Sequence, residues 1–519
     1  MTAGREPGMI AFVLHSHLPW LAHHGAWPVG EEWLYQSWAA SYLPMTEMLD
    51  RLAAEGRTEQ LTLGVTPVLA AQLDDPYCLE AMHHYLGNWQ LRAHEAALAD
   101  GPATGSAHRS PMAELGAREH RNAAHALELF ETRWRHGGTP VLRRLADAGT
   151  VELLGGPLAH PFQPLLHPRL RELSLREGLA YGTARLGSPA RTGIWAPECA
   201  YKPGMETGYE AAGVTHFMVD GPTLGGDTAL ARPVGDSSVL AFGRDLPVSY
   251  RVWSPKSGYP GHAAYRDFYA HDHATGLKPS RVTGKNVPES EKAPYDPERA
   301  DAVIDKHVAD FVDTVVARLR EESTRIGRDA LVVAAFDTEL FGHWWYEGPI
   351  WLERVLRALP EAGVRVGTLR SAAEAGFVGA PREIPASSWG SGKDWRVWEG
   401  PQVQEFVELN EDITATVLRV LDKRAAEQRG ARDVVADQVL QEALMCLQSD
   451  WPFMVSKDTA AGYARDRAYK HAHALREIAE AAERGDETRA VVLARGWRHA
   501  DDPFPGLDAR RLPAPLGGF

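Results

Sequence analysis

The chain has 519 residues, of which 44% are hydrophobic, and this length allows roughly two to four domains or one large barrel with additions. Its formal net charge is −14. An acidic chain without a basic block is a poor partner for nucleic acid or anionic membranes, but it does not repel a neutral ligand. The 16 tryptophans are the unusual part of the composition, because they offer large flat faces with one polar atom.

The three cysteines, Cys78, Cys199 and Cys446, are far apart and odd in number. They therefore predict neither a disulfide framework nor a zinc knuckle, and they favour a reducing compartment. The apolar run at residues 9–14 is too short for the core of a signal peptide, and no run reaches membrane-spanning length. We expect a cytoplasmic monomer.

Short apolar or β-branched runs recur along the first two thirds of the chain and predict strands. They lie at residues 9–14, 61–66, 151–156, 192–196, 215–220, 330–337 and 364–368. Most are apolar on both faces, which is typical of parallel strands covered by helices. Helical stretches separate several of them, so the pattern predicts a β/α barrel of about seven strands, with an open doubly wound sheet as the alternative.

Three segments depart from this alternation. Residues 74–150 are rich in alanine, histidine and glutamate and predict an inserted helical region. Residues 220–300 are rich in glycine, proline and polar residues and predict a long, functional loop region. Residues 381–519 show apolar residues at three- and four-residue spacing, which predicts a C-terminal helical domain. Two further strand-like pieces lie at residues 239–245 and 248–253.

Polar side chains follow the ends of several predicted strands. His15 and His17 close the first strand, His160 follows the third, Glu198 the fourth and Asp337 the sixth. Because the carboxyl ends of parallel strands meet at one rim of a barrel, we expect these side chains to converge. Taken singly, each has a simpler explanation, since the acids suit helix caps and the histidines suit hydrogen bonds in a core.

Two carboxylates at one rim suit glycoside chemistry, in which one attacks the anomeric carbon and the other protonates the leaving oxygen. The tryptophans that could form platforms for sugar rings are Trp20, Trp27, Trp195, Trp253, Trp344, Trp389 and Trp398. Trp389 and Trp398 lie in sequence rich in glycine and serine, where core packing explains a tryptophan poorly. The His15-x-His17 pair also suits zinc, so a metal-dependent polysaccharide hydrolase or deacetylase is a distant alternative.

A series of motifs runs along nearly the whole chain. They are HSHLPW (15–20), WPVGEEWL (27–34), GGPLAHPFQPLL (155–166), GIWAPECAY (193–201), FGRD (242–245), RVWS (251–254), FDTELFGHWWYEG (336–348) and SDWPF (449–453). Together they resemble glycoside hydrolase family 57, and within it the 1,4-α-glucan branching enzymes. No single motif has the specificity of the whole set.

This resemblance implies a (β/α)7 barrel over residues 1–380, with its inserted helical domain, and a C-terminal helical domain over 381–519 that completes the active-site cleft. It implies retaining transfer of α-1,4-glucan chains to form α-1,6 linkages, without a metal or cofactor. By motif position, Glu198 would be the nucleophile and Asp337 the general acid/base. The substrate-binding residues that the resemblance implies are His15, His17, Trp27, His160, Trp195, Arg251, Trp253, Trp389, Trp398 and Asp450.

One stretch departs from the family pattern. Branching enzymes of the family carry a tyrosine on a mobile loop after the fifth strand, and here residues 221–235 contain no aromatic side chain. That loop is thought to keep water from the glycosyl intermediate. An α-amylase or a 4-α-glucanotransferase on the same scaffold is therefore the alternative, and a retaining mechanism predicts a carboxyl separation of about 5–5.5 Å.

Overall fold

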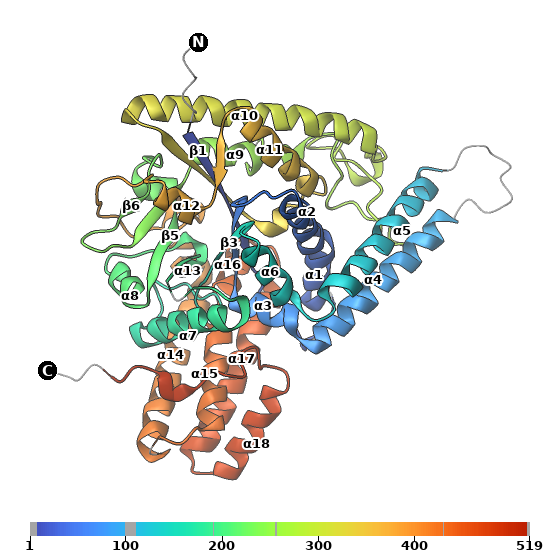
Figure 1. Cartoon of the computed structure of the whole chain (residues 1–519). Coiled ribbons are helices and arrows are strands. Elements are labelled where there is room, and N and C mark those ends of the chain that lie inside the picture. The colour runs from blue at the N-terminus through green and yellow to red at the C-terminus, as the bar shows by residue number, and fades with distance from the viewer. Residues whose placement is uncertain are drawn as a thin grey trace.

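The computed structural model describes residues 8–515 except 28, 99–109, 190, 255, 256 and 429. Two mainly parallel sheets lie at its centre, one with the order β3–β2–β1–β8 and β9 paired to β1, the other with the order β4–β5–β7–β6 (Figure 1). The strands are β1 (Gly8–Ser16), β2 (Leu61–Val65), β3 (Val151–Leu154), β4 (Thr192–Ile194), β5 (Val214–Asp220), β6 (Arg232–Pro233), β7 (Leu240–Arg244), β8 (Ala330–Asp337) and β9 (Arg365–Gly367).

The two sheets approach each other at two places. A parallel bridge joins Gly155, after β3, to Ile194 of β4. At the other side the backbone N–H of Asp245, after β7, donates to the carbonyl of Val333 on β8 at 2.8 Å. β1 is buried along its whole length, as its run of apolar residues requires. The carboxyl ends of the parallel strands therefore face one side of the molecule.

The two strand-like pieces of the long loop region have different structures. Residues 239–245 contain β7, which lies in the sheet between β5 and β6 and approaches β8. The prediction of a strand at 248–253 is wrong, because α9 (Leu246–Val252) occupies it. The side chain of Asp245 accepts from the backbone N–H of Val248 at 3.0 Å, and a proline follows this cap, which is a strong helix-start signal.

The predicted strand at 364–368 is confirmed as β9, but it pairs only with residues 9–11 at the start of β1. Helices surround the sheets, and the long α10 covers one side of β1 (Figure 1). The helices up to the last strand are α1 (Gly30–Ser37), α2 (Leu43–Ala54), α3 (Pro67–Asp74), α4 (Pro76–Ala97), α5 (Pro111–Leu129), α6 (Gly138–Asp147), α7 (Pro168–Leu186), α8 (Met205–Ala211), α9, α10 (Pro297–Ile326) and α11 (Gly348–Glu361).

The predicted helical region at 74–150 contains α4 and α5, which form a hairpin that projects from the sheets (Figure 1). The side chain of Asp75 caps α4 by accepting from the backbone N–H groups of Tyr77 and Cys78. Gly116 lets the two helices approach closely, since a Cβ atom there would lie 2.4 Å from the backbone nitrogen of Ala97.

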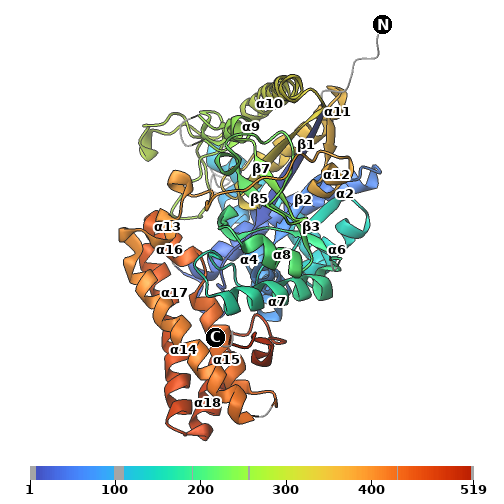
Figure 2. The same cartoon turned by 90° about the vertical axis from the view of Figure 1, so that its left-hand side faces the viewer.

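The C-terminal part is helical, as predicted. After α12 (Leu369–Glu374), which contacts β1, the helices of the C-terminal part are α13 (Arg396–Glu399), α14 (Gln404–Gln428), α15 (Val434–Cys446), α16 (Asp450–Ser456), α17 (Ala461–Glu483) and α18 (Glu487–Arg498). The long helices form a bundle beside the sheets, and α13 and α16 lie at the junction (Figure 2). No helix in the described ranges is both long and apolar enough to cross a membrane.

Candidate active site

Glu198 is presented by a strained turn that follows β4. The backbone of Glu198 has φ +62° and that of Cys199 has φ +49°, a left-handed conformation that costs free energy for residues other than glycine. The side chain of Glu198 is 7% exposed, and both of its oxygens accept hydrogen bonds. Trp389 Nε1 donates to Oε2 at 2.8 Å, and the hydroxyl of Ser449 donates to Oε1 at 2.8 Å.

The surroundings of Glu198 make it harder to ionise than an ordinary glutamate. Burial raises its pKa to about 7, while the hydrogen bonds from Trp389 and Ser449 act in the opposite direction. The charge of Asp450 raises the pKa of Glu198 further, and His17 lowers it. The carboxyl group is therefore poised near neutrality, where a nucleophile can lose its proton.

Asp337 ends β8 and lies directly opposite His15 in the pairing with β1. Burial raises the pKa of Asp337 well above its usual range, and the charges of Glu339 and Glu198 add to this effect. Arg244 acts in the opposite direction. Glu198 accepts two hydrogen bonds, and Asp337 holds its proton strongly. Two interacting carboxyl groups that differ in this way suit a base and an acid at one site.

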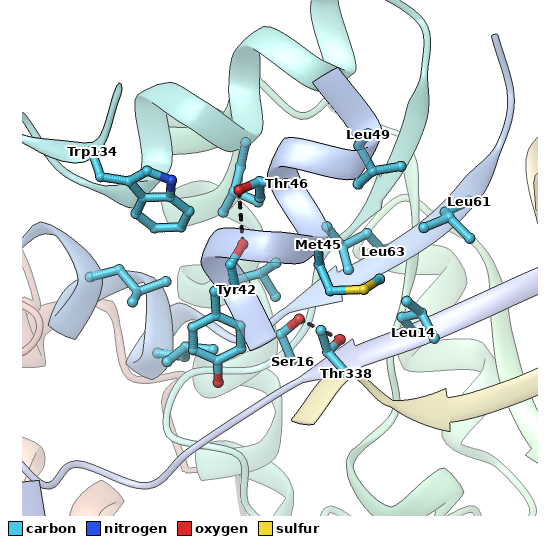
Figure 3. Close-up of a pocket in the computed structure, with 14 residues that line it drawn as sticks. Leu14, Ser16, Tyr42, Met45, Thr46, Leu49, Leu61, Leu63, Trp134 and Thr338 are labelled. Atoms are coloured by element: carbon cyan, nitrogen blue, oxygen red, sulfur yellow. Dashed lines mark hydrogen bonds between the residues drawn. The ribbon is translucent and has the colours of Figure 1, made fainter. Parts of the chain in front are cut away.

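A third buried carboxyl group, Glu339, lies two residues beyond this aspartate. The hydroxyl of Tyr42 donates to Glu339 Oε1 at 2.5 Å, and the backbone N–H of His17 donates to the same oxygen at 3.2 Å. Burial raises the pKa of Glu339 to about 7. Figure 3 shows Tyr42 beside the 2.7 Å hydrogen bond between Ser16 and Thr338, at the edge of a cavity with mainly apolar walls.

A row of hydrogen bonds leads from Glu198 into the interior. Ser449 Oγ lies 2.9 Å from His160 Nδ1, and His160 Nε2 lies 3.0 Å from His15 Nε2. The ring of His15 stacks on that of Trp195 with 4.3 Å between centroids. Burial lowers the pKa of both histidines well below the usual value, so both rings are neutral near pH 7.

His17, His160 and Asp450 carry ligand atoms close enough to hold a metal ion, so the zinc alternative can be tested on geometry. The two rings stack face to face with centroids 3.7 Å apart, and their in-plane lone pairs therefore run side by side instead of converging. His17 Nε2 is bound to Asp450 at 3.0 Å, and both nitrogens of His160 are engaged. The donor set does not suit a metal ion.

Two of the predicted tryptophans contact the catalytic region directly. Trp389 is half-buried, and the guanidinium of Arg244 lies 5.3 Å from its ring centre. Trp195 lies edge to face with Trp389 at 5.1 Å and is buried against His15. Trp195 thus supports its neighbours and has no open face for a sugar.

Trp398 is also a support, contrary to the expectation of a sugar platform. It is 2% exposed, its ring stacks on Phe162 with 4.4 Å between centroids, and its Nε1 donates to the backbone carbonyl of Ser449 at 3.2 Å. A glycine-rich sequence does not reveal this packing, because the burial comes from distant segments.

For three other predicted residues the described contacts do not include the carboxyl groups. Trp27 is 78% exposed in the loop before α1. Trp253 packs edge to face against Trp344 at 5.5 Å. Arg251, on α9, is partly exposed and forms an ion pair with Asp310 on α10.

Sequence reasoning missed Ser449 and Arg244 as members of the site. Arg244 Nε donates to Asp220 at 2.8 Å, and Lys393 Nζ lies 2.6 Å from the other oxygen of Asp220. Both residues lie in motifs that the sequence analysis named, Ser449 in SDWPF and Arg244 in FGRD. Membership of these motifs was the sequence signal that could have identified them.

Two interacting carboxyl groups that follow parallel strands are the arrangement that carbohydrate-active enzymes use to cleave glycosidic bonds. The chain belongs to glycosyl hydrolase family 57, whose model matches residues 11–384. A second model, described as the C-terminal part of 1,4-alpha-glucan branching enzyme, matches residues 411–511.

Individual relatives agree with this assignment. The chain is 64% identical to a probable 1,4-alpha-glucan branching enzyme from Mycobacterium tuberculosis, over 99% of each chain. The crystal structure of a branching enzyme of the family from Pyrococcus horikoshii superimposes with a TM-score of 0.89 at 28% identity, covering 99% of this chain and 98% of that one. An alpha-amylase from Thermotoga maritima shares the fold, with a TM-score of 0.85 at 23% identity over 98% and 99% of the two chains.

Proposed function

We propose that this protein is a 1,4-α-glucan branching enzyme, which cleaves an α-1,4-glucan and re-attaches the released chain through an α-1,6 linkage. The observation that carries the proposal combines similarity and geometry. The segment that matches the branching-enzyme C-terminal model includes Ser449 and Asp450, and these residues contact Glu198 and His17 at the strand ends. The full-length similarity to a probable branching enzyme supports the same activity.

In the proposed mechanism the ionised Glu198 attacks the anomeric carbon of the donor glucan. Asp337 gives its proton to the departing O4, and the glycosidic bond breaks as the bond to Glu198 forms. Asp337, now ionised, accepts the proton of a 6-hydroxyl group on the acceptor chain. That oxygen attacks the anomeric carbon and releases Glu198, so two inversions retain the α configuration.

The remaining predicted site residues have supporting roles in this proposal. His17 and Asp450 lie beside the nucleophile with polar atoms suited to sugar hydroxyls, and Trp389 holds Glu198 while part of its ring stays exposed. Trp27, with its open face, suits a more distant part of the glucan chain. Arg251 and Trp253 stay predictions from the family resemblance.

We also infer that the parallel strands form one distorted (β/α)7 barrel. The bridge between Gly155 and Ile194 and the hydrogen bond between Asp245 and Val333 support closure of the ring β1–β2–β3–β4–β5–β7–β8. In this view residues 1–380 are the catalytic barrel, with insertions at 74–150 and 220–300, and 381–519 are the C-terminal domain. The monomeric state and the cytoplasmic location stay predictions from the sequence.

Hydrolysis is the competing fate of the glycosyl-enzyme. Residues 221–235, which contain no aromatic side chain, pack against the segment that follows α12. Ala231 donates its backbone N–H to Phe377 and accepts one from Gly379, both at 2.9 Å. Because residues 221–235 are held by backbone hydrogen bonds and contain no aromatic side chain, they do not form a mobile loop that shields the glycosyl-enzyme from water. We therefore expect measurable hydrolysis beside transfer.

The proposal is tested by incubating the protein with amylose and measuring linkages by proton NMR and by digestion with a debranching enzyme. We expect new α-1,6 signals and chains released by debranching, with a smaller yield of reducing ends. Shorter linear products without α-1,6 linkages would overturn the branching assignment in favour of the amylase or glucanotransferase alternative. Heat-treated protein is the control.

A further inference from the structure

The hydroxyl of Ser449 lies between two groups that compete for its single proton. It is 2.8 Å from Glu198 Oε1 and 2.9 Å from His160 Nδ1. An ionised carboxylate can only accept, so Ser449 donates to Glu198 and must accept from His160 Nδ1–H. Because neutral imidazole carries one N–H, Nε2 of His160 is then an acceptor.

His15 completes this assignment. Its Nε2 donates to Nε2 of His160 at 3.0 Å, which leaves its own Nδ1 without a proton. That Nδ1 has no hydrogen-bond partner among the residues that the structure describes, and it faces Gly64, where a Cβ atom would lie 3.5 Å away. An unprotonated nitrogen costs less to leave without a partner than an N–H group. The surroundings of His15 Nδ1 therefore agree with the proton positions that an ionised Glu198 requires in Ser449, His160 and His15.

The opposite order belongs to a protonated Glu198. In that state Glu198 donates to Ser449, Ser449 donates to His160 Nδ1, and His15 carries its proton on Nδ1. In this arrangement Glu198, Ser449, His160 and His15 carry one more proton in total, and the N–H of His15 Nδ1 is buried against Gly64 without a partner among the described residues. The hydrogen bonds from His15 through His160 to Ser449 therefore favour the ionised form of Glu198, because Ser449 is left with its proton to donate to the carboxylate.

We propose that Ser449 is a positioning residue for glycosyl transfer, which donates to the ionised carboxylate of Glu198 and fixes its orientation for attack on the anomeric carbon. This inference rests on the proposed branching function. Ser449 is held in turn, since its backbone N–H donates to His160 O at 3.0 Å and its carbonyl accepts from Trp398 Nε1. The serine precedes α16, so the C-terminal helices supply part of the nucleophile's support.

The experiment compares Ser449→Ala with the wild type in steady-state branching of amylose across pH. Loss of a hydrogen bond to a charged group predicts a fall in kcat of about ten- to a hundredfold. KM stays near the wild-type value, because the serine contacts the nucleophile and not the sugar. The acid limb of kcat/KM moves to higher pH, because the lost donor had lowered the pKa of Glu198. Asp337, Asp450, His17 and Arg244 stay unchanged in both proteins.

Two further variants separate positioning from folding. Ser449→Cys carries a weaker donor and is expected to give a kcat between those of serine and alanine. Ser387→Ala is the matched control, since Ser387 is also buried and its hydroxyl has no partner among the described residues. It is expected to keep kcat and the pH profile. Thermal unfolding of each variant shows whether the fold is intact.

The outcomes distinguish the two proposals. A wild type that forms no α-1,6 linkages contradicts the proposed function. An active wild type with unchanged kcat and acid limb in Ser449→Ala contradicts the role of Ser449 alone. An equal loss of activity in Ser449→Ala and Ser387→Ala, together with a lowered Tm, also overturns it, because that pattern reports a purely structural effect.

Discussion

Two buried clusters of histidine and carboxyl groups join the segment after β1 to the C-terminal helices, and they differ in how charge is balanced. One is the site around Glu198. In the other, His24 donates to Asp501 at 2.7 Å, and His471 lies 2.9 Å from both Glu442 and Arg467. In each cluster the nitrogen and oxygen atoms of two histidines and one carboxylate lie close together.

The second cluster contains its own cation. Burial alone would raise the pKa of Asp501, but His471, His24 and Arg467 together lower it. Burial and then the charge of Asp501 raise the pKa of Glu442 well above its usual value. One buried arginine thus balances one carboxylate, and the cluster is a structural junction. Around Glu198 the two donors, Trp389 and Ser449, are neutral and do not balance the charge of an ionised carboxylate.

The largest effect is expected when Glu198 is replaced. Glu198→Gln keeps the shape but removes the attacking charge, so turnover should fall by on the order of a thousandfold or more. The same change should stabilise the fold at high pH. Because burial raises the pKa of Glu198 from 4.5 to about 7, the free energy of unfolding falls as pH rises through this window, by about 3 kcal/mol.

Amylose turnover and denaturant unfolding at pH 4 and pH 8 check both parts. The variant should match the wild type in stability at pH 4 and exceed it at pH 8. Retained turnover would remove Glu198 as the nucleophile, and a variant less stable than the wild type at pH 8 would contradict the cost assigned to its buried charge.

The structural junction should respond in the opposite way to Arg467→Met. Removing the buried cation leaves Asp501 without its balancing charge, and the expected loss of unfolding free energy is about 3–5 kcal/mol. Arg465→Met, on the same helix but at a partly exposed ion pair, should cost at most about 1 kcal/mol. Urea unfolding measures both, and equal effects would show that the buried cluster is not a special junction.

Glu339→Gln should produce the smallest effect, a change in pH profile. The charge of Glu339 raises the pKa of Asp337, so its removal lowers that pKa and moves the alkaline limb of kcat/KM to lower pH. Glu347→Gln is the matched control, because Glu347 is also buried with its pKa raised to about 7 but accepts from Arg266 instead. Profiles that shift alike would contradict a local action of Glu339.

Most of the candidate site could be predicted from the sequence, because the apolar runs show where each predicted strand ends. Apolar runs followed by Glu198 and Asp337 predicted two acids at one rim. In the structure Glu198 follows β4 and Asp337 is the last residue of β8, while their catalytic roles stay predictions. The roles of Trp389 and Trp398 could not be separated, since both lie in similar loops. One of them is partly open and the other is packed on Phe162 by segments far away in the chain.

Ser449 was missed for a related reason. A serine is common in loops and before helices, and only its distance to Glu198 gives it a role. The predicted strand at 248–253 is wrong for a local reason, because the cap at Asp245 and the following Pro247 start a helix there. Local signals therefore predicted the elements and the acids, while the partners that distant segments contribute to Glu198 became visible only in the three-dimensional structure.

The hydrogen bond between Ser449 and Glu198 spans 251 positions of the chain. During synthesis on the ribosome, Glu198 leaves the exit tunnel long before its donors at positions 389 and 449 exist. The growing polypeptide would therefore have an incompletely supported nucleophile until the last helices are made and docked.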